Sequence, residues 1–194
     1  MSETKGVQPG PDGKPRCWWS VGADDYLAYH DEEWGRPLHG ERELFERLTL
    51  EAFQSGLSWL TILRKRENFR LAFDGFEIER VAEYGDAEVE RLLADAGIVR
   101  NRRKIEAAIT NARAARQMHA TDETLDELIW GFAPQDRRPA PESLAELEST
   151  TPESKALAKE LKKKGFVFVG PTTVYATMEA VGVVNDHLAG CTFR

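Results

Sequence analysis

Two cysteines and two of the four histidines stand in pairs near opposite ends of the chain. Cys17 precedes His30 by thirteen residues, and His187 precedes Cys191 by four. Cysteine sulfur and histidine nitrogen are typical ligands of tetrahedral zinc, and four protein ligands leave no position for a catalytic water. Such a site would be structural and would offset the cost of closing a long loop between the two ends. The spacing matches no zinc finger, so unrelated thiols and surface histidines remain the alternative.

A group of aromatic residues accompanies a carboxyl group in the first third of the chain. Such clusters usually belong to a core, but this one is interrupted by loop-like segments at Gly35 and Gly56. Glu51 lies within LTLEAFQSGLSW, where apolar neighbours impose a desolvation cost on a carboxylate. Aromatic faces with one carboxylate are what a pocket for a flat purine needs, whereas a solvated helix residue is the alternative for Glu51. The aromatic residues are Trp18, Trp19, Tyr26, Tyr29, Trp34 and Trp59.

The segment LLADAGIVRNRRKIEAAI, residues 92–109, predicts two helices joined by a tight turn at Gly97. A turn that leads into a helix N-terminus offers unpaired backbone N–H groups and a positive dipole end to phosphate. Such a hairpin grips DNA without reading its sequence. An ordinary corner between helices is the alternative. The basic residues beside this turn are Arg100, Arg102, Arg103 and Lys104.

The rest of the chain is also helical in pattern, so the predicted fold class is all-α. DAEVERLLADAG begins with Asp86 as a plausible cap, and Thr151 with Pro152 begins another helix. The run FVFV at 166–169 is too short to imply a sheet and is interpreted as a buried connector. Residues 133–150 predict a surface loop or crossover. Helices are expected within 41–53, 58–73, 86–97, 102–118, 121–132 and 151–165.

Composition restricts the class of protein. The 194 residues are 41% hydrophobic and 30% charged, which is typical of a soluble globular domain. We expect a flexible leader over residues 1–15 and one helical domain over 16–194, in which the two chain ends could form a second lobe. No apolar run is long enough for a membrane span and no secretory signal is present, so a cytoplasmic location with reduced cysteines is expected. The net charge of −7 argues mildly against nucleic acid, but the distribution of basic residues matters more than the sum.

Together, several segments closely resemble the DNA-3-methyladenine glycosylase I family. The resemblance covers residues 17–191 apart from the proline-rich loop. It implies a helix-hairpin-helix fold whose N- and C-terminal segments are tied together by one structural zinc ion. It also implies release of 3-methyladenine from alkylated double-stranded DNA. No lysine stands out as a nucleophile, so we predict an enzyme that does not cleave the strand. An enzyme that acts lesion by lesion can work as a monomer, and we expect one. The segments that carry the resemblance are CWW, YHDEEWG, LEAFQSGLSWLTILRKRENFR, DAGIVRNRRKIEAAITNARA and KKKGFVFVGPTTVYATMEAVGVVNDHLAGC.

The same resemblance implies roles for individual residues. Glu51 would read the adenine edge, and Leu57 would fill the stack vacated by the flipped base. Asp122 and Asp126 are interpreted as helix-start residues rather than catalytic acids. The implied base pocket contains Tyr29, Trp59, Trp19, Tyr26 and Trp34 around Glu51. The implied DNA contacts are Leu57, Gly97, Arg100, Arg102, Arg103 and Lys104. The implied zinc ligands are Cys17, His30, His187 and Cys191.

Two other classes of function remain open at this point. A non-catalytic helix-hairpin-helix module would share the basic hairpin but would not need Glu51, Tyr29 and Trp59 together. A zinc hydrolase would need an open coordination position. The chain ends three residues after Cys191, so that cysteine would have to be held by the packing of His187 and its neighbours.

Overall fold

The computed structural model describes residues 6–136 and 138–194, and this part of the chain is mostly helical. The predicted helical class is therefore confirmed. Short 3-10 turns lie at Trp18–Gly22, Asp74–Phe76 and Leu144–Glu146. The strands are β1 (Val7–Pro9) and β2 (Pro15–Cys17). The helices are α1 (Asp24–Glu32), α2 (Glu41–Gln54), α3 (Trp59–Ala72), α4 (Ile78–Ala82), α5 (Asp86–Ala94), α6 (Arg102–His119), α7 (Leu125–Trp130), α8 (Pro152–Lys163) and α9 (Pro171–Ala180).

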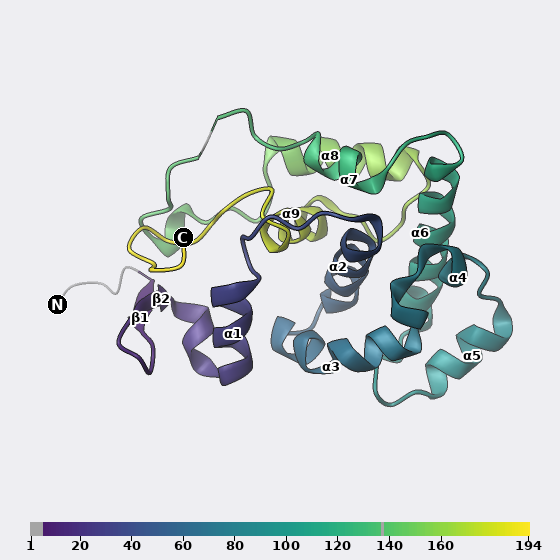
Figure 1. Ribbon diagram of the computed structural model, residues 1–194, viewed down its shortest axis with the longest axis horizontal. Coiled ribbons are helices and arrows are strands. Elements are labelled where there is room, and N and C mark those ends of the chain that lie inside the picture. Colours follow the sequence, from purple (N-terminus) through teal and green to yellow (C-terminus); the bar gives the residue numbers. More distant parts are fainter. Residues whose placement is uncertain (1–5, 137) are drawn as a thin grey trace.

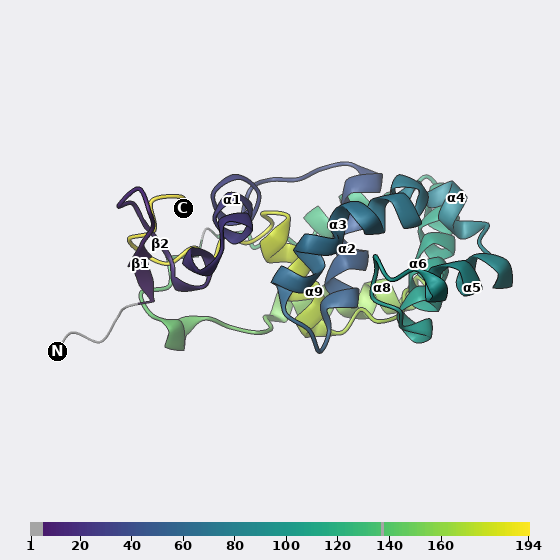
Figure 2. The same ribbon diagram turned by 90° about the horizontal axis from the view of Figure 1, so that it is seen from below.

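The elements form an elongated molecule in which the N-terminal strand pair and the C-terminal segment lie at the same pole (Figure 1). The strand pair, α1 and the C-terminal segment gather there, while α4, α5 and α6 form the opposite pole. Helices α2 and α9 lie between the poles and pack against each other, and α9 also packs against α8. Figure 2 shows from below that the C-terminal segment returns to β1, β2 and α1. Sequence-distant segments therefore meet at one end of the molecule.

Local capping signals account for several helix boundaries. The Thr151 side chain accepts a hydrogen bond from the Ser154 N–H, the Ser154 hydroxyl oxygen accepts one from the Thr151 N–H, and α8 begins as predicted. The expected Asp86 cap is wrong, because Gly85 occupies the cap position and Asp86 is the first helical residue. Helix α5 ends at Ala94, three residues before Gly97.

The N-terminal segment differs from the expected flexible leader. Residues 7–17 form an antiparallel hairpin in which Val7 is paired with Cys17. The Arg16 guanidinium donates to both Asp12 and Asp31, and its side chain is almost fully buried. The Thr192 N–H also donates to the Pro15 carbonyl. The expectation is therefore wrong for residues 6–15, whereas residues 1–5 of the predicted leader lie outside the described residues.

Two connectors behave largely as expected. In the 133–150 segment, where residue 137 lies outside the described residues, the short turn at Leu144–Glu146 is the regular structure observed. In the 166–169 segment no strand forms, and Phe166 and Val169 are buried while Val167 and Phe168 are partly exposed. The Asn111 side chain pairs with both backbone polar groups of Val167, which takes the place of a sheet partner.

Apolar packing fixes the orientation of α2. Phe53, Phe69 and Phe73 are fully buried and pack with ring centroids 4.8 to 6.2 Å apart. Leu48 on α2 is also buried. Residues on the remaining face of α2, including Glu51, are consequently directed toward α1 and α9. Within the described residues, no helix is long and apolar enough to cross a membrane.

Candidate active site and metal centre

A pocket of about 290 Å³ lies where α2, α9, α1 and the start of α3 meet. It contains all six residues of the predicted base pocket, although their sequence positions span forty residues. This volume is near the lower end of the range for small-molecule sites. The lining residues are Trp19, Tyr26, Tyr29, Trp34, Glu51, Gln54, Ser58, Trp59, Ala176 and Glu179.

The aromatic rings of the pocket hold one another in place by edge-to-face and tilted contacts. The Trp19 ring meets Trp34 at 5.1 Å and 84° and meets Tyr26 at 5.5 Å and 81°. The Tyr29 and Trp59 rings lie 5.3 Å apart at 45°. Such pairs are favourable beyond their buried area. The Tyr26 hydroxyl oxygen also accepts a hydrogen bond from the Leu60 N–H, which ties α1 to α3.

Glu51 is the buried carboxyl group of this pocket, with only 5% of its surface exposed. Burial raises the pKa of Glu51 to about 7, and the positive charge of Arg47 opposes that rise. The Arg47 guanidinium lies 5.4 Å from the Tyr29 ring centroid and 5.6 Å from that of Trp59. Glu51 is therefore poised between its charged and neutral forms near physiological pH.

A charge network behind the pocket holds Arg47 in position. Arg47 donates to the Glu33 carboxylate at 3.1 Å, and Arg66 donates to the same carboxylate at 2.5 and 2.9 Å. The three residues come from α2, the turn after α1, and α3. The network therefore joins the elements that carry the pocket rings and also keeps a cation near Glu51.

Glu179 is a second carboxyl group in the pocket, and it was not among the predicted pocket residues. It comes from α9, a helix that was not among those expected from sequence. Pro171 after Gly170 was a usable signal, since proline favours the first turn of a helix. The apolar positions Val174 and Met178, four residues apart, support the same prediction.

The four predicted metal ligands meet at the pole formed by β1, β2, α1 and the C-terminal segment. Their donor atoms all lie within 4.8 Å of one another, and all four residues are buried. The Cys191 Sγ atom is 3.5 Å from His30 Nε2 and 3.4 Å from His187 Nδ1, and Cys17 Sγ is 3.8 Å from His187 Nδ1. Zinc with bonds of about 2.0 to 2.3 Å in a tetrahedron requires similar separations between its ligands. The donor set and its spacing therefore fit zinc.

Both histidines of this cluster have their second ring nitrogen engaged. His30 Nδ1 lies 2.7 Å from an Asp31 carboxylate oxygen, and His187 Nε2 lies 3.0 Å from the Trp34 carbonyl oxygen. Metal-binding histidines commonly donate their other N–H to such an acceptor, which fixes the ring orientation. Trp34 also lines the aromatic pocket, so its contact with His187 connects the metal cluster to the pocket.

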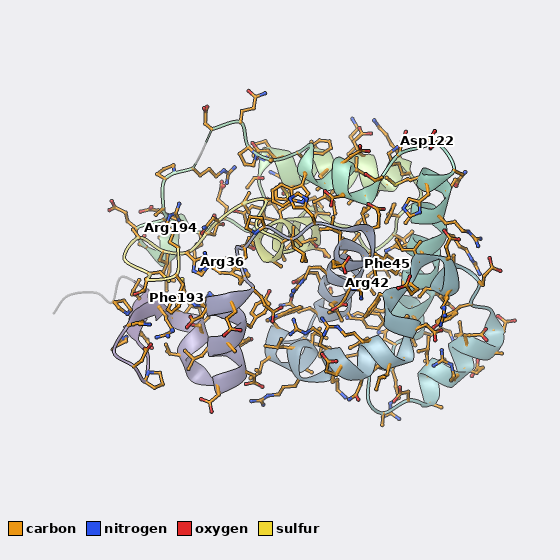
Figure 3. The ribbon with its side chains drawn as sticks, viewed as in Figure 1. Arg36, Arg42, Phe45, Asp122, Phe193 and Arg194 are labelled. Carbon is orange, nitrogen blue, oxygen red and sulfur yellow. The ribbon has the colours of Figure 1, made fainter. Side chains whose placement is uncertain are left out.

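The short tail after Cys191 packs against the cluster. Figure 3 shows Phe193 and Arg194 at the pole that also carries β1, β2 and α1. The Phe193 ring lies 5.8 Å from the His30 ring, and the Arg16 guanidinium lies 4.6 Å from the Phe193 ring centroid. Arg194 donates to the His187 carbonyl oxygen at 2.6 Å. Phe193 and Arg194 therefore cover this side of the cluster.

The predicted wedge occupies the loop between α2 and α3. Leu57 is 43% exposed, and its neighbours Gln54 and Ser58 line the pocket. Gly56 before it has a φ of 82°, in the left-handed region that favours glycine. The Ser58 hydroxyl oxygen accepts a hydrogen bond from the Thr61 N–H and begins α3. The loop thus presents an apolar side chain beside the pocket.

The predicted hairpin forms from α5, α6 and the turn between them. Arg100, Arg102 and Arg103 are exposed around the α6 N-terminus. Arg102 pairs with Glu90, whereas Arg100 and Arg103 have no ion-pair partner in the part of the chain that the structure describes. A side chain at Gly97 would come within 2.9 Å of Asp95 and would crowd the turn. The contacts of these residues with phosphate stay a prediction.

Lys104 is the exception among the predicted phosphate contacts. It is only 8% exposed, and its ammonium donates to the carbonyl oxygens of Phe53 at 2.8 Å and Ser55 at 2.6 Å. These carbonyls are at the C-terminal end of α2, where cationic side chains are favoured. The predicted DNA contact is therefore wrong for Lys104, which instead links the hairpin to the loop that carries Leu57.

An aromatic pocket with buried carboxyl groups, next to a helical hairpin and an exposed wedge, is the arrangement expected of a DNA glycosylase that flips a purine out of the duplex. Comparison with known proteins agrees with that class. Residues 18–194 match the family described as methyladenine glycosylase. The chain is 47% identical over 177 residues to DNA-3-methyladenine glycosylase 1 of Escherichia coli strain K12, covering 91% of this chain and 95% of that protein. The chain belongs to the methyladenine glycosylase family.

Other relatives give the same result. DNA-3-methyladenine glycosylase of Haemophilus influenzae is 41% identical over 179 residues, covering 91% of this chain and 96% of that protein. A crystal structure of a 3-methyladenine DNA glycosylase I superimposes with a TM-score of 0.88 at 47% identity, covering 91% of this chain and 98% of the other. The enzyme from Staphylococcus aureus, whose structure concerns 3-methyladenine recognition, superimposes at 0.85 with 34% identity, covering 90% and 93% of the two chains.

Proposed function

We propose that this chain releases 3-methyladenine from alkylated double-stranded DNA by hydrolysing the N-glycosidic bond, as a base-excision repair enzyme that leaves the strand intact. The observation that carries the proposal is Glu51, a buried carboxyl group within an aromatic pocket beside an exposed Leu57. A relative of this fold has been solved in complex with 3-methyladenine, at 33% identity. A non-catalytic DNA-binding module would have no use for a desolvated acid in such a pocket.

The chemistry needs little help from a general acid, because the lesion is itself a good leaving group. Methylation at N3 gives the base a positive charge. When the bond between C1′ and N9 breaks, its electron pair neutralises that charge, so the base leaves without being protonated. A water oxygen then bonds to C1′ and its proton passes to solvent. The protein's contribution is to flip the nucleotide, exclude competing water and hold the departing base.

Each part of the site has a role in this scheme. The Glu51 carboxylate accepts a hydrogen bond from the exocyclic amino group, and a cationic base favours the charged form of Glu51. The rings of Tyr29 and Trp59 enclose the purine, with Trp19, Tyr26 and Trp34 around them. Leu57 fills the vacated stack. Gly97, Arg100, Arg102 and Arg103 hold the phosphate backbone at the hairpin.

The metal centre is part of the same proposal. Zinc held by Cys17, His30, His187 and Cys191 would join the two ends of the chain and would support Trp34 at the wall of the pocket. Four protein ligands leave zinc no open position, so it would contribute stability rather than an activated water. We also propose that the enzyme acts as a cytoplasmic monomer and that residues 16–194 form one domain, which residues 6–15 join through the 7–17 hairpin.

The proposal is tested by incubating the protein with methylated duplex DNA and separating the released bases by chromatography. Free 3-methyladenine is expected from the wild type, with intact strands on a denaturing gel. The Glu51→Gln variant should lose base release, while Glu43→Gln, a half-exposed acid on the same helix, should retain it. No released base from folded wild-type protein would reject the enzyme and favour the non-catalytic module. Base release unchanged in Glu51→Gln would reject the role of Glu51.

A further inference from the structure

The base pocket holds two carboxyl groups, and among the described residues a cation acts on only one of them. Glu51 on α2 and Glu179 on α9 line the same 290 Å³ pocket, and the two helices pack against each other. Arg47 acts on Glu51, whereas the charges that act on Glu179 are those of Asp186 and Glu51. Two interacting acids in such unequal surroundings ionise in separate steps.

The surroundings of Glu179 favour its neutral form. Its side chain has no hydrogen-bond or ion-pair partner among residues 6–136 and 138–194. Burial first, then the negative charges of Asp186 and Glu51, raise the pKa of Glu179 well above its ordinary value. Asp186 accepts a hydrogen bond from the Tyr175 hydroxyl and makes none with Glu179 in the described part of the chain. The pocket therefore contains one acid that ionises more easily and one that retains its proton.

We propose that Glu179 is a second base-recognition group, a carboxylic acid that keeps its proton and donates it in a hydrogen bond to the bound purine while Glu51 accepts one. The inference rests on the proposed function, since it names how the same pocket reads its base. It assigns the specificity of the pocket to a pair of acids from two helices, one acting as an acceptor and the other as a donor.

The chemistry of the adenine edge matches such a pair. Adenine presents the exocyclic N6 amino group as a donor beside ring nitrogens that accept. An ionised Glu51 can accept only, and a protonated Glu179 can donate. Guanine presents O6 and N7, which both accept, so its edge would leave the Glu51 carboxylate facing an oxygen. An unmatched buried polar group is the strongest basis for discrimination between similar ligands. The pair therefore selects adenine-type over guanine-type lesions.

Binding of free 3-methyladenine gives a direct test, because tryptophans in the pocket wall report occupancy through their fluorescence. The variants are Glu179→Gln, which keeps a neutral donor, and Glu179→Met, which fills similar space without one. Glu148→Gln is the control, because Glu148 borders an adjoining cavity with Glu179 but does not line the base pocket. Near neutral pH, Glu179→Gln should bind within about threefold of the wild type, and Glu179→Met at least about tenfold more weakly. The control should bind as the wild type does.

The pH dependence separates this role from a structural one. Above about pH 8 Glu51 is already largely ionised, because its pKa is about 7. As the pH rises further, Glu179 loses its proton, so wild-type affinity should fall, whereas affinity of Glu179→Gln should stay level. The other titratable groups that face Glu179 are Glu51, Asp186, Tyr29 and Tyr175. Burial raises the pKa of both phenols above their ordinary value, so they stay protonated in this range. A residue needed only for packing would alter the melting temperature of its variants without changing this profile.

The results that overturn the inference are distinct from those that overturn the proposed function. If the wild type neither binds nor releases 3-methyladenine, the proposed function itself fails. If the wild type binds and Glu51→Gln does not, equal affinity of the folded Glu179→Met variant rejects the role of Glu179 alone. An alkaline loss of affinity that persists unchanged in Glu179→Gln also rejects it, and this readout does not depend on the stability of the Met variant.

Discussion

Replacing Glu51 with glutamine should stabilise the protein at alkaline pH while it removes base recognition. The pKa of Glu51 is raised from 4.5 to about 7, chiefly by burial, so the folded chain holds this proton more tightly than the unfolded chain does. Between pH 4.5 and about pH 7, the Glu51 carboxyl group is ionised in the unfolded chain and still protonated in the folded chain. Raising the pH through this window therefore lowers the stability of the wild type.

The magnitude follows from the size of that shift. One pKa unit corresponds to about 1.4 kcal/mol. The whole shift of the Glu51 pKa therefore lowers the free energy of unfolding of the wild type by roughly 3 kcal/mol once the pH is above 7. Glutamine is similar in shape and does not titrate, and Arg47 keeps Glu33 as its partner in the variant. The variant should therefore match the wild type near pH 4 and exceed it by roughly 3 kcal/mol near pH 8. For a chain of this length that difference corresponds to about 6 to 12 °C in melting temperature.

Urea unfolding of both proteins at about pH 4, 5, 6, 7 and 8 measures this difference, with circular dichroism as the readout. Subtraction removes most of the contribution of Glu179 and the metal ligands, which both proteins share. Glu43→Gln serves as the control, since that acid is half-exposed and should show no pH-dependent difference. Parallel curves for Glu51→Gln and the wild type, or a variant less stable at pH 8, would refute the argument that desolvation of Glu51 costs stability. A stable but inactive variant is the expected trade-off at a functional site.

Other parts of the site lead to separate expectations. Cys17→Ala should lose bound zinc, measured by elemental analysis, and should lower the melting temperature by at least several degrees, with base release retained by the folded fraction at low temperature; a metal-free variant as stable as the wild type would contradict a structural metal. Leu57→Ala should slow base release from duplex DNA at least about tenfold while affinity for free 3-methyladenine stays unchanged. Arg103→Gln should weaken duplex binding and reduce the slope of log affinity against log salt by about 1; an unchanged slope would place Arg103 away from phosphate. Lys104→Met should lower the free energy of unfolding by about 2 kcal/mol, measured by urea unfolding, through loss of two charged hydrogen bonds, and should leave the salt slope unchanged.

Local signals made part of the structure predictable from sequence. The Thr151 cap and the Asn101 start of α6 depend on residues within one turn, so they are readable without knowing the fold. The meeting of Cys17 and His30 with residues near the C-terminus is different, because it depends on a contact across almost the whole chain. The residue types alone left the metal site and unrelated thiols equally open. Only the motif resemblance favoured the arrangement that the structure contains.

Residues whose role depends on distant partners could not be assigned from sequence. Glu179 is a single acid in a largely apolar segment, and its place in the pocket follows from the packing of α9 on α2. Arg16 lies in a segment rich in glycine and proline, which is typical of a flexible leader. Its ion pairs with Asp12 and Asp31 give that segment a fixed position, because a buried arginine must be paired. Composition averages over such specific contacts and therefore misses them.

Lys104 shows how the parts of the site keep their positions relative to one another. From sequence, Lys104 was predicted to bind phosphate with the arginines of the hairpin, because a run of basic residues is typical of a phosphate-binding surface. Its ammonium instead satisfies the carbonyls of Phe53 and Ser55, which follow Glu51 on α2 and precede Leu57 in the loop. Helix ends leave carbonyl groups unpaired, and a buried cation there joins two elements through hydrogen bonds of fixed length. The hairpin that would grip the backbone, the leucine that would enter the stack and the acid that would read the base are thus connected within a few residues of one helix terminus. A shift of the hairpin relative to the pocket would have to break these Lys104 hydrogen bonds, so a phosphate held at the hairpin would lie at a fixed distance from Glu51.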